Sequence, residues 1–209
     1  MTGSVAVTLS ELELDALTEL VNLGVSNAAS SLRELVREEI LLSVPKVVVV
    51  TRKEAIENLG ERDSKPLVAV HQDFDGDLRG RALLIFPEAK SMELVRAIVG
   101  NDLSLEDIME LEQEALAETG NILLNACLAT IANTLQRTLR ISLPEVVHGL
   151  GTEFFDLTQS PSLGDSVIFI YINFSFRSRD VQGYIAMLLD LPSLAMLKSL
   201  LATLIERTQ

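Results

Sequence analysis

The sequence predicts an α+β fold: a single domain of two pseudo-twofold-related α/β repeats, with a mainly antiparallel sheet packed against long helices. Three observations support this prediction. Two long segments space their apolar residues as helices do, β-branched runs follow each of them, and the second half of the chain repeats the first. The 209 residues, 48% of them hydrophobic, are enough for one continuous core. We therefore expect one domain over residues 1–209, with repeat one at about 10–100 and repeat two at about 105–207.

The internal repeat is visible when the sequence is compared with itself at a shift of 99 positions. The shift lays ELELDALTELVN (residues 11–22) on ELEQEALAETGN (residues 110–121), and SVPKVV (43–48) on SLPEVV (142–147). Over the whole stretch 11–48, eleven of the 38 aligned positions are identical without a gap. Chance at average residue usage would give about two or three. Beyond the prolines the halves still correspond, with a small insertion in the second.

The first repeat predicts a long helix followed by strands and a shorter helix. Ser10 and Glu13 form a capping box that opens a helix from about 11 to 39. A β-branched strand then runs through Pro45, followed by two strands around the turn DFDGD and a helix opened by a proline. The segment 58–66 predicts a surface loop.

The second repeat predicts the same order of elements. Its insertion, residues 149–165, carries turn residues at both ends, and the sequence leaves open whether Phe154 and Phe155 inside it are core or interface residues. The predicted elements are a helix at roughly 105–139, strands near 141–148, 166–176 and 182–190, and a last helix from 192 to about 206.

Composition excludes several classes of partner. A net charge of −13, with 17 scattered Lys and Arg residues, argues against nucleic-acid and anionic-membrane surfaces. No apolar run approaches the length of roughly 20 residues that a helix needs to cross a bilayer. The N-terminus shows no signal-peptide pattern. We therefore expect a cytoplasmic protein without membrane insertion.

The residues that usually carry catalysis are sparse. The single cysteine, Cys127, lies among apolar neighbours and predicts a small buried residue. His71 and His148 stand apart in probable strands, so we expect structural histidines and no metal site. The sequence also lacks a glycine-rich phosphate loop, a nucleophile elbow and zinc-ligand spacing.

Each long helix carries an acid, a second acid four residues on, and an amide three residues beyond that. Residues at these spacings fall within about 60° of one another around a helix, so each set shares one narrow face. We call this set the acid–amide stripe, and we expect it to face solvent in both helices and not to form a buried polar network. The two stripes are Asp15, Glu19 and Asn22 in the first helix, and Glu114, Glu118 and Asn121 in the second.

A polar helix face explains the acids in these stripes but not the amides. Asn is a weak helix former, yet it recurs at the same place in two otherwise diverged helices. Its amide offers a donor and an acceptor that can orient a water molecule, while a carboxylate one turn away can hold a cation. From the residues alone, a functional stripe and a relic of duplication stay open as alternatives.

The stripe and a distant proline together resemble a known signature, that of the CheC, CheX and FliY family of chemotaxis phosphatases. In each copy twenty-two residues separate the Asn from the proline, which is Pro45 in the first and Pro144 in the second. The likeness covers nearly the whole chain and is greatest for CheC, which carries two motifs and no flagellar-switch domain. One position departs from the family pattern, because Glu114 stands where the family has Asp or Ser.

The resemblance implies an enzyme that hydrolyses the aspartyl phosphate of a response regulator, chiefly CheY. The Asn amides would orient the attacking water, and the Glu carboxylates would pair with the regulator's phosphate-contacting lysine. The regulator would bring its own Mg²⁺, so no cofactor of this chain is expected. The catalytic residues would be Glu19, Asn22, Glu118 and Asn121, with Asp15 and Glu114 as partner-binding residues.

Two further expectations come from the resemblance. Pro45 and Pro144 would be structural, turning the chain out of each long helix into the sheet. The alternative function is a non-catalytic adaptor that binds a response regulator or the receptor deamidase CheD.

Overall fold

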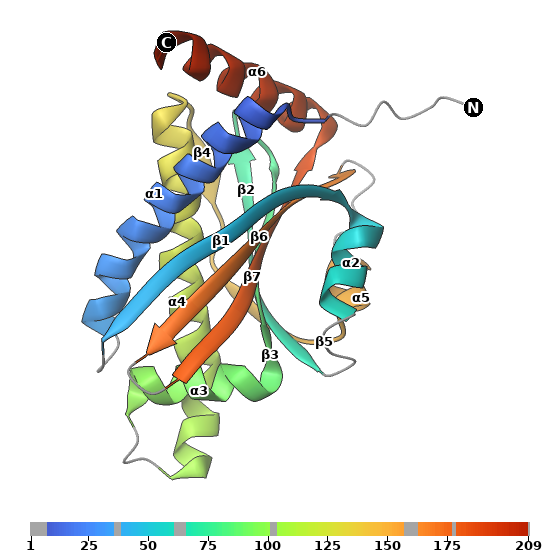
Figure 1. The fold of residues 1–209 in the computed structure, drawn as a ribbon. Helices are drawn as coiled ribbons and strands as arrows, with labels where there is room; N and C mark the ends of the chain where they lie inside the picture. Colours follow the sequence, from blue (N-terminus) through green and yellow to red (C-terminus); the bar gives the residue numbers. More distant parts are fainter. Residues whose placement is uncertain are drawn as a thin grey trace.

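The fold is α+β, as predicted (Figure 1). The computed structural model describes residues 8–35, 39–60, 66–100, 104–156, 163–176 and 179–208. The elements in chain order are α1 (Glu11–Leu35), β1 (Ile40–Thr51), α2 (Arg52–Gly60), β2 (Leu67–Gly76), β3 (Gly80–Pro87), α3 (Glu88–Val99), α4 (Leu105–Thr134), β4 (Leu139–Ile141), β5 (Glu145–Gly149), α5 (Gly151–Asp156), β6 (Leu163–Phe176), β7 (Arg179–Asp190) and α6 (Leu191–Thr208).

Strands from both predicted repeats share one curled sheet. Its order is β1-β6-β7-β3-β2-β4, and β5 also pairs with β2. Every described strand pair is antiparallel, which confirms the predicted sheet type. The pairing of β2 with β4 and β5 joins the first half of the chain to the second. The pseudo-twofold relation between the halves stays a prediction.

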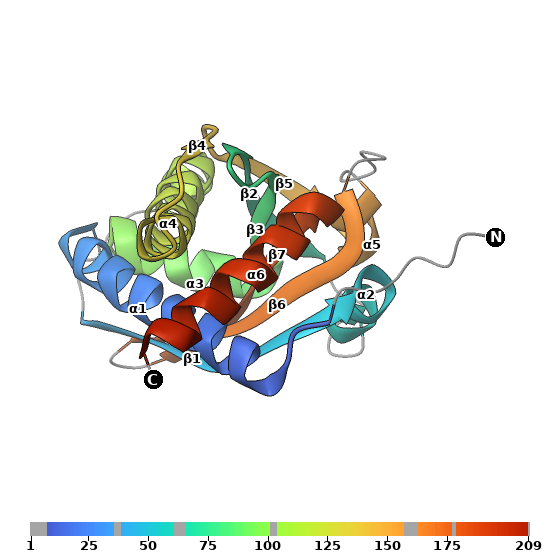
Figure 2. The ribbon, with the colours of Figure 1, turned by 90° about the horizontal axis from the view of Figure 1, so that it is seen from above.

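Helices cover both faces of this sheet. In β6, Ile168 and Ile170 pack in the large cluster under α1, α3, α4 and α6, whereas Val167 and Phe169 pack in a second cluster with α2 and α5. Successive side chains of a strand point to opposite faces, so a strand covered on both sides is apolar throughout. Figure 2 shows the sheet passing between the long helices and the pair formed by α2 and α5.

The helices α2 and α5 are not predicted by the sequence analysis. The predicted loop at 58–66 is wrong for its first three residues, which belong to α2, while 61–65 lie outside the described residues. The insertion contains α5, which buries Phe154 and Phe155 to 1% and 2% exposure, so both are core residues. Helices of nine and six residues are too short to show a clear helical period.

The helix α4 is shorter at its C-terminal end than predicted, whereas the end of α1 falls beside residues outside the described part of the chain. The described part of α1 ends at Leu35 instead of about 39, with 36–38 outside the described residues. The helix α4 ends at Thr134 instead of 139, because Gln136 takes a left-handed conformation with φ of 55°. Both helix starts agree with the prediction to within a residue or two.

The prolines lie inside the sheet, so the expectation that they turn the chain out of the helices is wrong. Pro45 is within β1, where the pairing with β6 shifts register between Ser43 and Lys46. Pro144 lies between β4 and β5, where the pairing with β2 is interrupted. Proline has no N–H for a strand ladder, and these breaks in pairing are where a strand tolerates it.

The helix α4 corrects the expectation that no apolar run is long enough for a bilayer. The stretch Glu106–Thr134 has the length and mean hydropathy of a membrane-spanning helix. However, 56% of its most apolar window is buried inside the fold. Packing against α1 and the sheet accounts for this composition.

Close contact between α1 and α4 holds the long helices together. A Cβ atom on Gly24 would lie 2.7 Å from the Cα of Cys127, so only glycine allows this approach. One turn further along, Asn27 Nδ2 donates to Thr130 Oγ1 at 3.3 Å. Cys127 is fully buried in this contact, as predicted.

The Gly24 contact predicts a packing defect in Gly24→Ala. The added methyl group meets backbone atoms of α4, which no rotamer change can move. We expect overpacking to cost about 1–3 kcal/mol, more than the roughly 1 kcal/mol that alanine gains in helix propensity. Urea unfolding followed by circular dichroism measures the free energy of unfolding. The control is Ser26→Ala at an exposed position of the same helix. A Gly24→Ala protein as stable as the Ser26→Ala protein would contradict this reading.

Burial of Cys127 predicts an inert thiol. Removal from water raises the pKa of the Cys127 thiol to about 12, so little thiolate exists at pH 8. We expect Ellman's reagent at pH 8 to label the unfolded protein in urea stoichiometrically and the folded protein only at the rate of unfolding. Fast labelling of the folded protein would show that the cysteine is accessible.

Candidate functional site

The first acid–amide stripe lies on the outer side of α1. Asp15 and Glu19 are exposed and Asn22 is half-buried, whereas Leu17 and Val25 are buried against the sheet. The start of this helix is fixed by the predicted capping box. In the capping box the Ser10 N–H donates to Glu13 Oε2 at 2.7 Å and the Glu13 N–H donates to Ser10 Oγ at 3.3 Å. The stripe therefore begins one turn inside a firmly capped helix.

The second stripe has the same exposure pattern on α4. Glu114 and Glu118 are exposed and Asn121 is half-buried. This helix also starts with a capping box, here between Ser104 and Asp107, which the sequence analysis did not identify. Both stripes thus stand on rigid helices, with their acids in solvent as expected.

The two stripes face away from each other. The α1–α4 contact is centred on Gly24 and Cys127, and each lies roughly opposite its own stripe around the helix axis. Each stripe therefore lies on the outer flank of the helix pair, where a partner can approach it without obstruction from the other helix. The structure does not bring the six predicted residues into one site; it makes two sites of three.

Asn121 belongs to a partly buried amide cluster, so the expectation of a purely solvent-facing stripe is wrong for α4. Asn125 Nδ2 donates to Asn121 Oδ1 at 2.8 Å, and Gln72 Nε2 donates to the same oxygen at 3.3 Å. The same Gln72 nitrogen donates to the carbonyl oxygen of Ser142 at 2.8 Å. Asn22 has no side-chain hydrogen bond to any residue that the structure describes.

Gln72 is the site residue that the sequence analysis missed. It is fully buried in β2, on the side of the strand that Val68, Val70 and Phe74 share beneath the long helices. A polar residue at an apolar position of a two-residue period is the signal that could have identified it.

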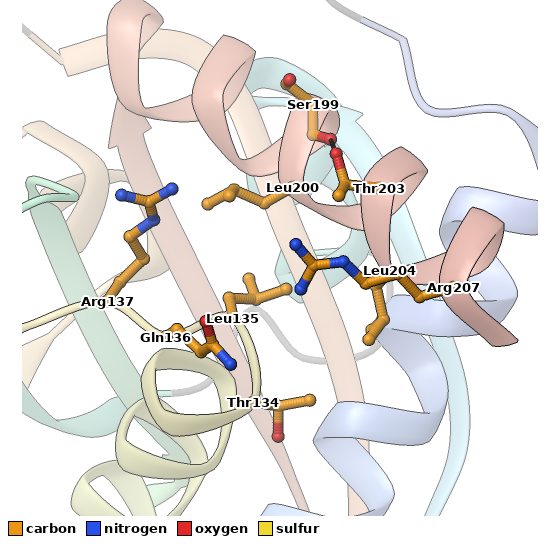
Figure 3. A pocket seen from close by; sticks show the side chains of 9 residues that line it. All are labelled: Thr134, Leu135, Gln136, Arg137, Ser199, Leu200, Thr203, Leu204 and Arg207. Carbon is orange, nitrogen blue, oxygen red and sulfur yellow. Dashed lines mark hydrogen bonds between the residues drawn. The ribbon is translucent and has the colours of Figure 1, made fainter.

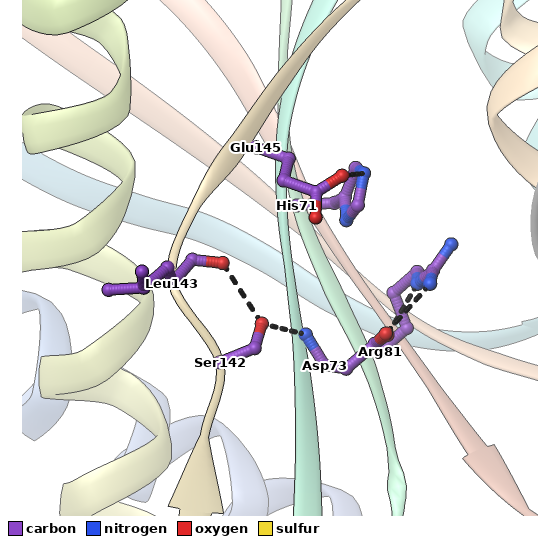
Figure 4. A network of polar contacts seen from close by, with 6 residues as sticks. All are labelled: His71, Asp73, Arg81, Ser142, Leu143 and Glu145. Atoms are coloured by element: carbon purple, nitrogen blue, oxygen red, sulfur yellow. Dashed lines mark hydrogen bonds and ion pairs between the residues drawn. The ribbon is translucent and has the colours of Figure 1, made fainter.

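A polar network borders this second site along β2 (Figure 4). Arg81 Nη2 donates to Asp73 Oδ2 at 2.8 Å, and this hydrogen bonding lowers the pKa of the Asp73 carboxyl. Burial lowers the pKa of His71, whose Nε2 lies 3.5 Å from Glu145 Oε2. The neutral form of the His71 side chain is therefore favoured. This agrees with a structural role for His71.

A separate pocket of about 410 Å³ lies between the end of α4 and α6 (Figure 3). Arg137 and Arg207 reach it from opposite sides, above Leu135 and Leu204. Its lining contains no residue of either stripe, and it lies about 20 Å along α4 from Asn121. Within the described ranges, no group of three or more His, Cys, Asp or Glu side chains is placed to hold a metal ion.

The chemistry available at each stripe is limited to docking and positioning. Carboxylates one turn apart can pair with a partner's cation, and an amide one turn further can hold a water molecule. Neither stripe contains a Ser, Thr, Cys, Lys or His side chain. Reaction at such a surface requires that the partner bring the reacting group.

Comparison with known families gives a match over the segment that contains the first stripe. The model of the CheC-like family matches residues 12–49. This range contains Glu19 and Asn22 of the first stripe, together with Pro45.

Individual relatives agree with this match. The chain is 30% identical to the CheY-P phosphatase CheC of Bacillus subtilis over 141 residues, which are 66% of this chain and 67% of that protein. The crystal structure of Thermotoga maritima FliY superposes with a TM-score of 0.70 at 18% identity, covering 94% of this chain and 99% of that one. The CheX–CheY–BeF3–Mg²⁺ complex from Borrelia burgdorferi matches with a TM-score of 0.50 at 17% identity, covering 79% and 95%. On its sequence and its fold, the chain belongs to the CheC-like family.

Proposed function

We propose that the protein is a phosphatase that hydrolyses the aspartyl phosphate of a CheY-like response regulator. One observation carries the proposal: two rigid, capped helices each present an exposed Glu and, one turn further, an Asn, on opposite flanks of the molecule. The B. subtilis relative is named a CheY-P phosphatase, and a CheX has been crystallised in complex with CheY. Both names support the same class of substrate.

Glu19 and Glu118 are the docking carboxylates in this proposal. Each is exposed and makes no ion pair with a described residue, so it is available to a partner's cation. The regulator's phosphate-contacting lysine is that cation. A charge-assisted hydrogen bond to it fixes how the regulator sits on the helix. Asp15 and Glu114, one turn earlier and also exposed, add to the same acidic surface.

Asn22 and Asn121 are the catalytic amides. An acyl phosphate is already reactive, and the regulator supplies the Mg²⁺ that neutralises charge on the phosphoryl oxygens. Holding the attacking water in line is the main contribution left to the phosphatase. A helix places an amide about 4.5 Å along its axis from a carboxylate three residues earlier, so one docked regulator can meet both groups.

Apolar side chains beside the first stripe support docking of a protein. Leu12 and Leu23 are 59% and 47% exposed. They lie within about 40° of Glu19 around the helix axis. Exposed leucines beside charged side chains are typical of a protein interface. In such an interface the apolar contacts supply affinity and the charges set orientation.

The proposal predicts graded loss of activity when the stripes are removed. We expect Glu19→Ala with Asn22→Ala to abolish one site and leave the other, and Glu118→Ala with Asn121→Ala to do the converse. The protein with all four changes should leave the regulator at its own dephosphorylation rate. Loss of phosphate from a phosphorylated CheY-like regulator with Mg²⁺ measures the rate.

The matched control is Glu106→Ala with Asn133→Ala, an exposed acid and an exposed amide of α4 outside the stripe. This control should keep full activity. If the fourfold variant kept full activity, the assignment of the stripes would be wrong. Regulator binding without acceleration by the unaltered protein would favour the adaptor function.

A further inference from the structure

The buried amide of Gln72 gives one of the two proposed sites a component that the other lacks. Gln72 is 0% exposed in β2, on the apolar side of the sheet, and its Nε2 reaches both Asn121 Oδ1 and the carbonyl oxygen of Ser142. Its own Oε1 accepts no hydrogen bond from the residues that the structure describes. A buried acceptor without a partner is unfavourable for stability. Stability of the core therefore does not explain this amide, whereas its hydrogen bond to Asn121 does.

The geometry fixes which atom of Asn121 points inward. The Ser142 carbonyl can only accept, so the nitrogen of Gln72 must face it at 2.8 Å. The second hydrogen of that nitrogen faces two acceptors, Asn121 Oδ1 at 3.3 Å and Asn125 Oδ1 at 3.5 Å. The nearer of the two is the Asn121 oxygen. Asn125 Nδ2 donates to the same oxygen at 2.8 Å, which occupies its second lone pair. The NH₂ group of Asn121 is the group left to act outside the cluster.

The Ser142 carbonyl is itself held in place. The Ser142 N–H donates to the Asp73 carbonyl oxygen at 2.8 Å, and the Asp73 N–H donates to Ser142 Oγ at 3.0 Å (Figure 4). Hydrogen bonds from Arg81 hold the Asp73 side chain in turn. A chain of contacts thus runs from the sheet through Ser142 and Gln72 to the amide of Asn121.

The matching place beside the first stripe holds an apolar residue. Beside α4, β2 pairs Phe74 with Ile141 and His71 with Glu145. In β1, the strand on which α1 packs, Leu42 pairs with Phe174 of β6 and Lys46 pairs with Tyr171. The shift of 99 residues lays Leu42 on Ile141 and Lys46 on Glu145.

Ile172 therefore stands where Gln72 stands, and it is fully buried. The same shift lays the exposed Ser26 on Asn125. Neither member of the cluster around Asn121 has an amide counterpart near Asn22.

We propose that Gln72 is a positioning residue that orients Asn121 and makes the two sites unequal. Gln72 holds the Asn121 oxygen inward, so the NH₂ group of Asn121 faces outward. This NH₂ group donates a hydrogen bond to one lone pair of the attacking water, and the other lone pair of the water attacks the phosphorus. The Asn121 site is thereby ordered before the regulator docks, whereas Asn22 must be ordered during docking. The inference rests on the proposed phosphatase function.

The test is Gln72→Met, which keeps the length of the side chain and removes its donor. The change is made in a protein with only the Asn121 site (Glu19→Ala, Asn22→Ala) and in one with only the Asn22 site (Glu118→Ala, Asn121→Ala). We expect kcat for the phosphorylated regulator to fall on the order of ten-fold in the first protein and to stay unchanged in the second. KM should change little, because Glu118 still docks the regulator. Ile172→Met, the matched change beside α1, should alter neither.

A second readout does not depend on activity. The side-chain amide of Asn121 should give an ordered NMR signal in the unaltered protein and a mobile one in Gln72→Met, while Asn22 stays mobile in both. Unchanged order at Asn121 would overturn the inference. So would an equal fall of kcat in both single-site proteins, because Gln72 would then act through stability alone. If the Asn121 site were inactive even with Gln72 present, the proposed function would fail there, and the amide signal would still decide whether Gln72 holds Asn121.

Discussion

The contact between α1 and α4 determines where both candidate sites lie. These helices cover the same face of the curled sheet and meet where Gly24 approaches the backbone at Cys127. With their inner sides committed to each other and to the sheet, only the outer flanks remain for polar residues. The acids of both stripes lie on those flanks in solvent, and the amides of both are half-buried. Packing of the core thus exposes two separate surfaces.

The long elements could be predicted from the sequence because their signals are local. The start of α1 follows from Ser10 and Glu13, and the polar faces of α1 and α4 follow from helical spacing. The places of the prolines depend on strand pairing with residues far away in the chain, and the end of α4 depends on the left-handed backbone of Gln136. The short helices α2 and α5 cover the second face of the sheet. A capping box between Thr51 and Glu54 opens α2, but the helix is too short for its apolar spacing to indicate it.

The candidate site could be predicted only in part for the same reason. The spacing of Glu118 and Asn121 indicates a stripe, but it does not indicate that β2 passes beneath it. Gln72 lies 49 residues from Asn121 in the chain and reaches it at 3.3 Å only because β2 pairs with β4 and β5 of the other half. Helix periodicity identifies residues on one face, whereas the contacts that orient them come from tertiary structure.

Repetition of a motif does not by itself make two sites equivalent. The stripes match in residue type and exposure, yet Asn121 is held by two amides and Asn22 by none among the described residues. With this difference, one protein has an Asn121 site that is ordered before docking and an Asn22 site that is ordered during docking, both for the same kind of partner. The positively lined pocket between α4 and α6 contains no residue of either stripe. It therefore provides an internal comparison for any map of the docking surface.

Mapping of regulator binding tests the central claim most directly. A CheY-like regulator activated with beryllium fluoride and Mg²⁺ would be titrated into isotope-labelled protein while the side-chain amide signals are followed by NMR. The account predicts that the signals of Asn22 and Asn121 both shift and that saturation occurs at two regulators per chain. Signals that shift only around Arg137 and Arg207, with both asparagines unaffected, would contradict it.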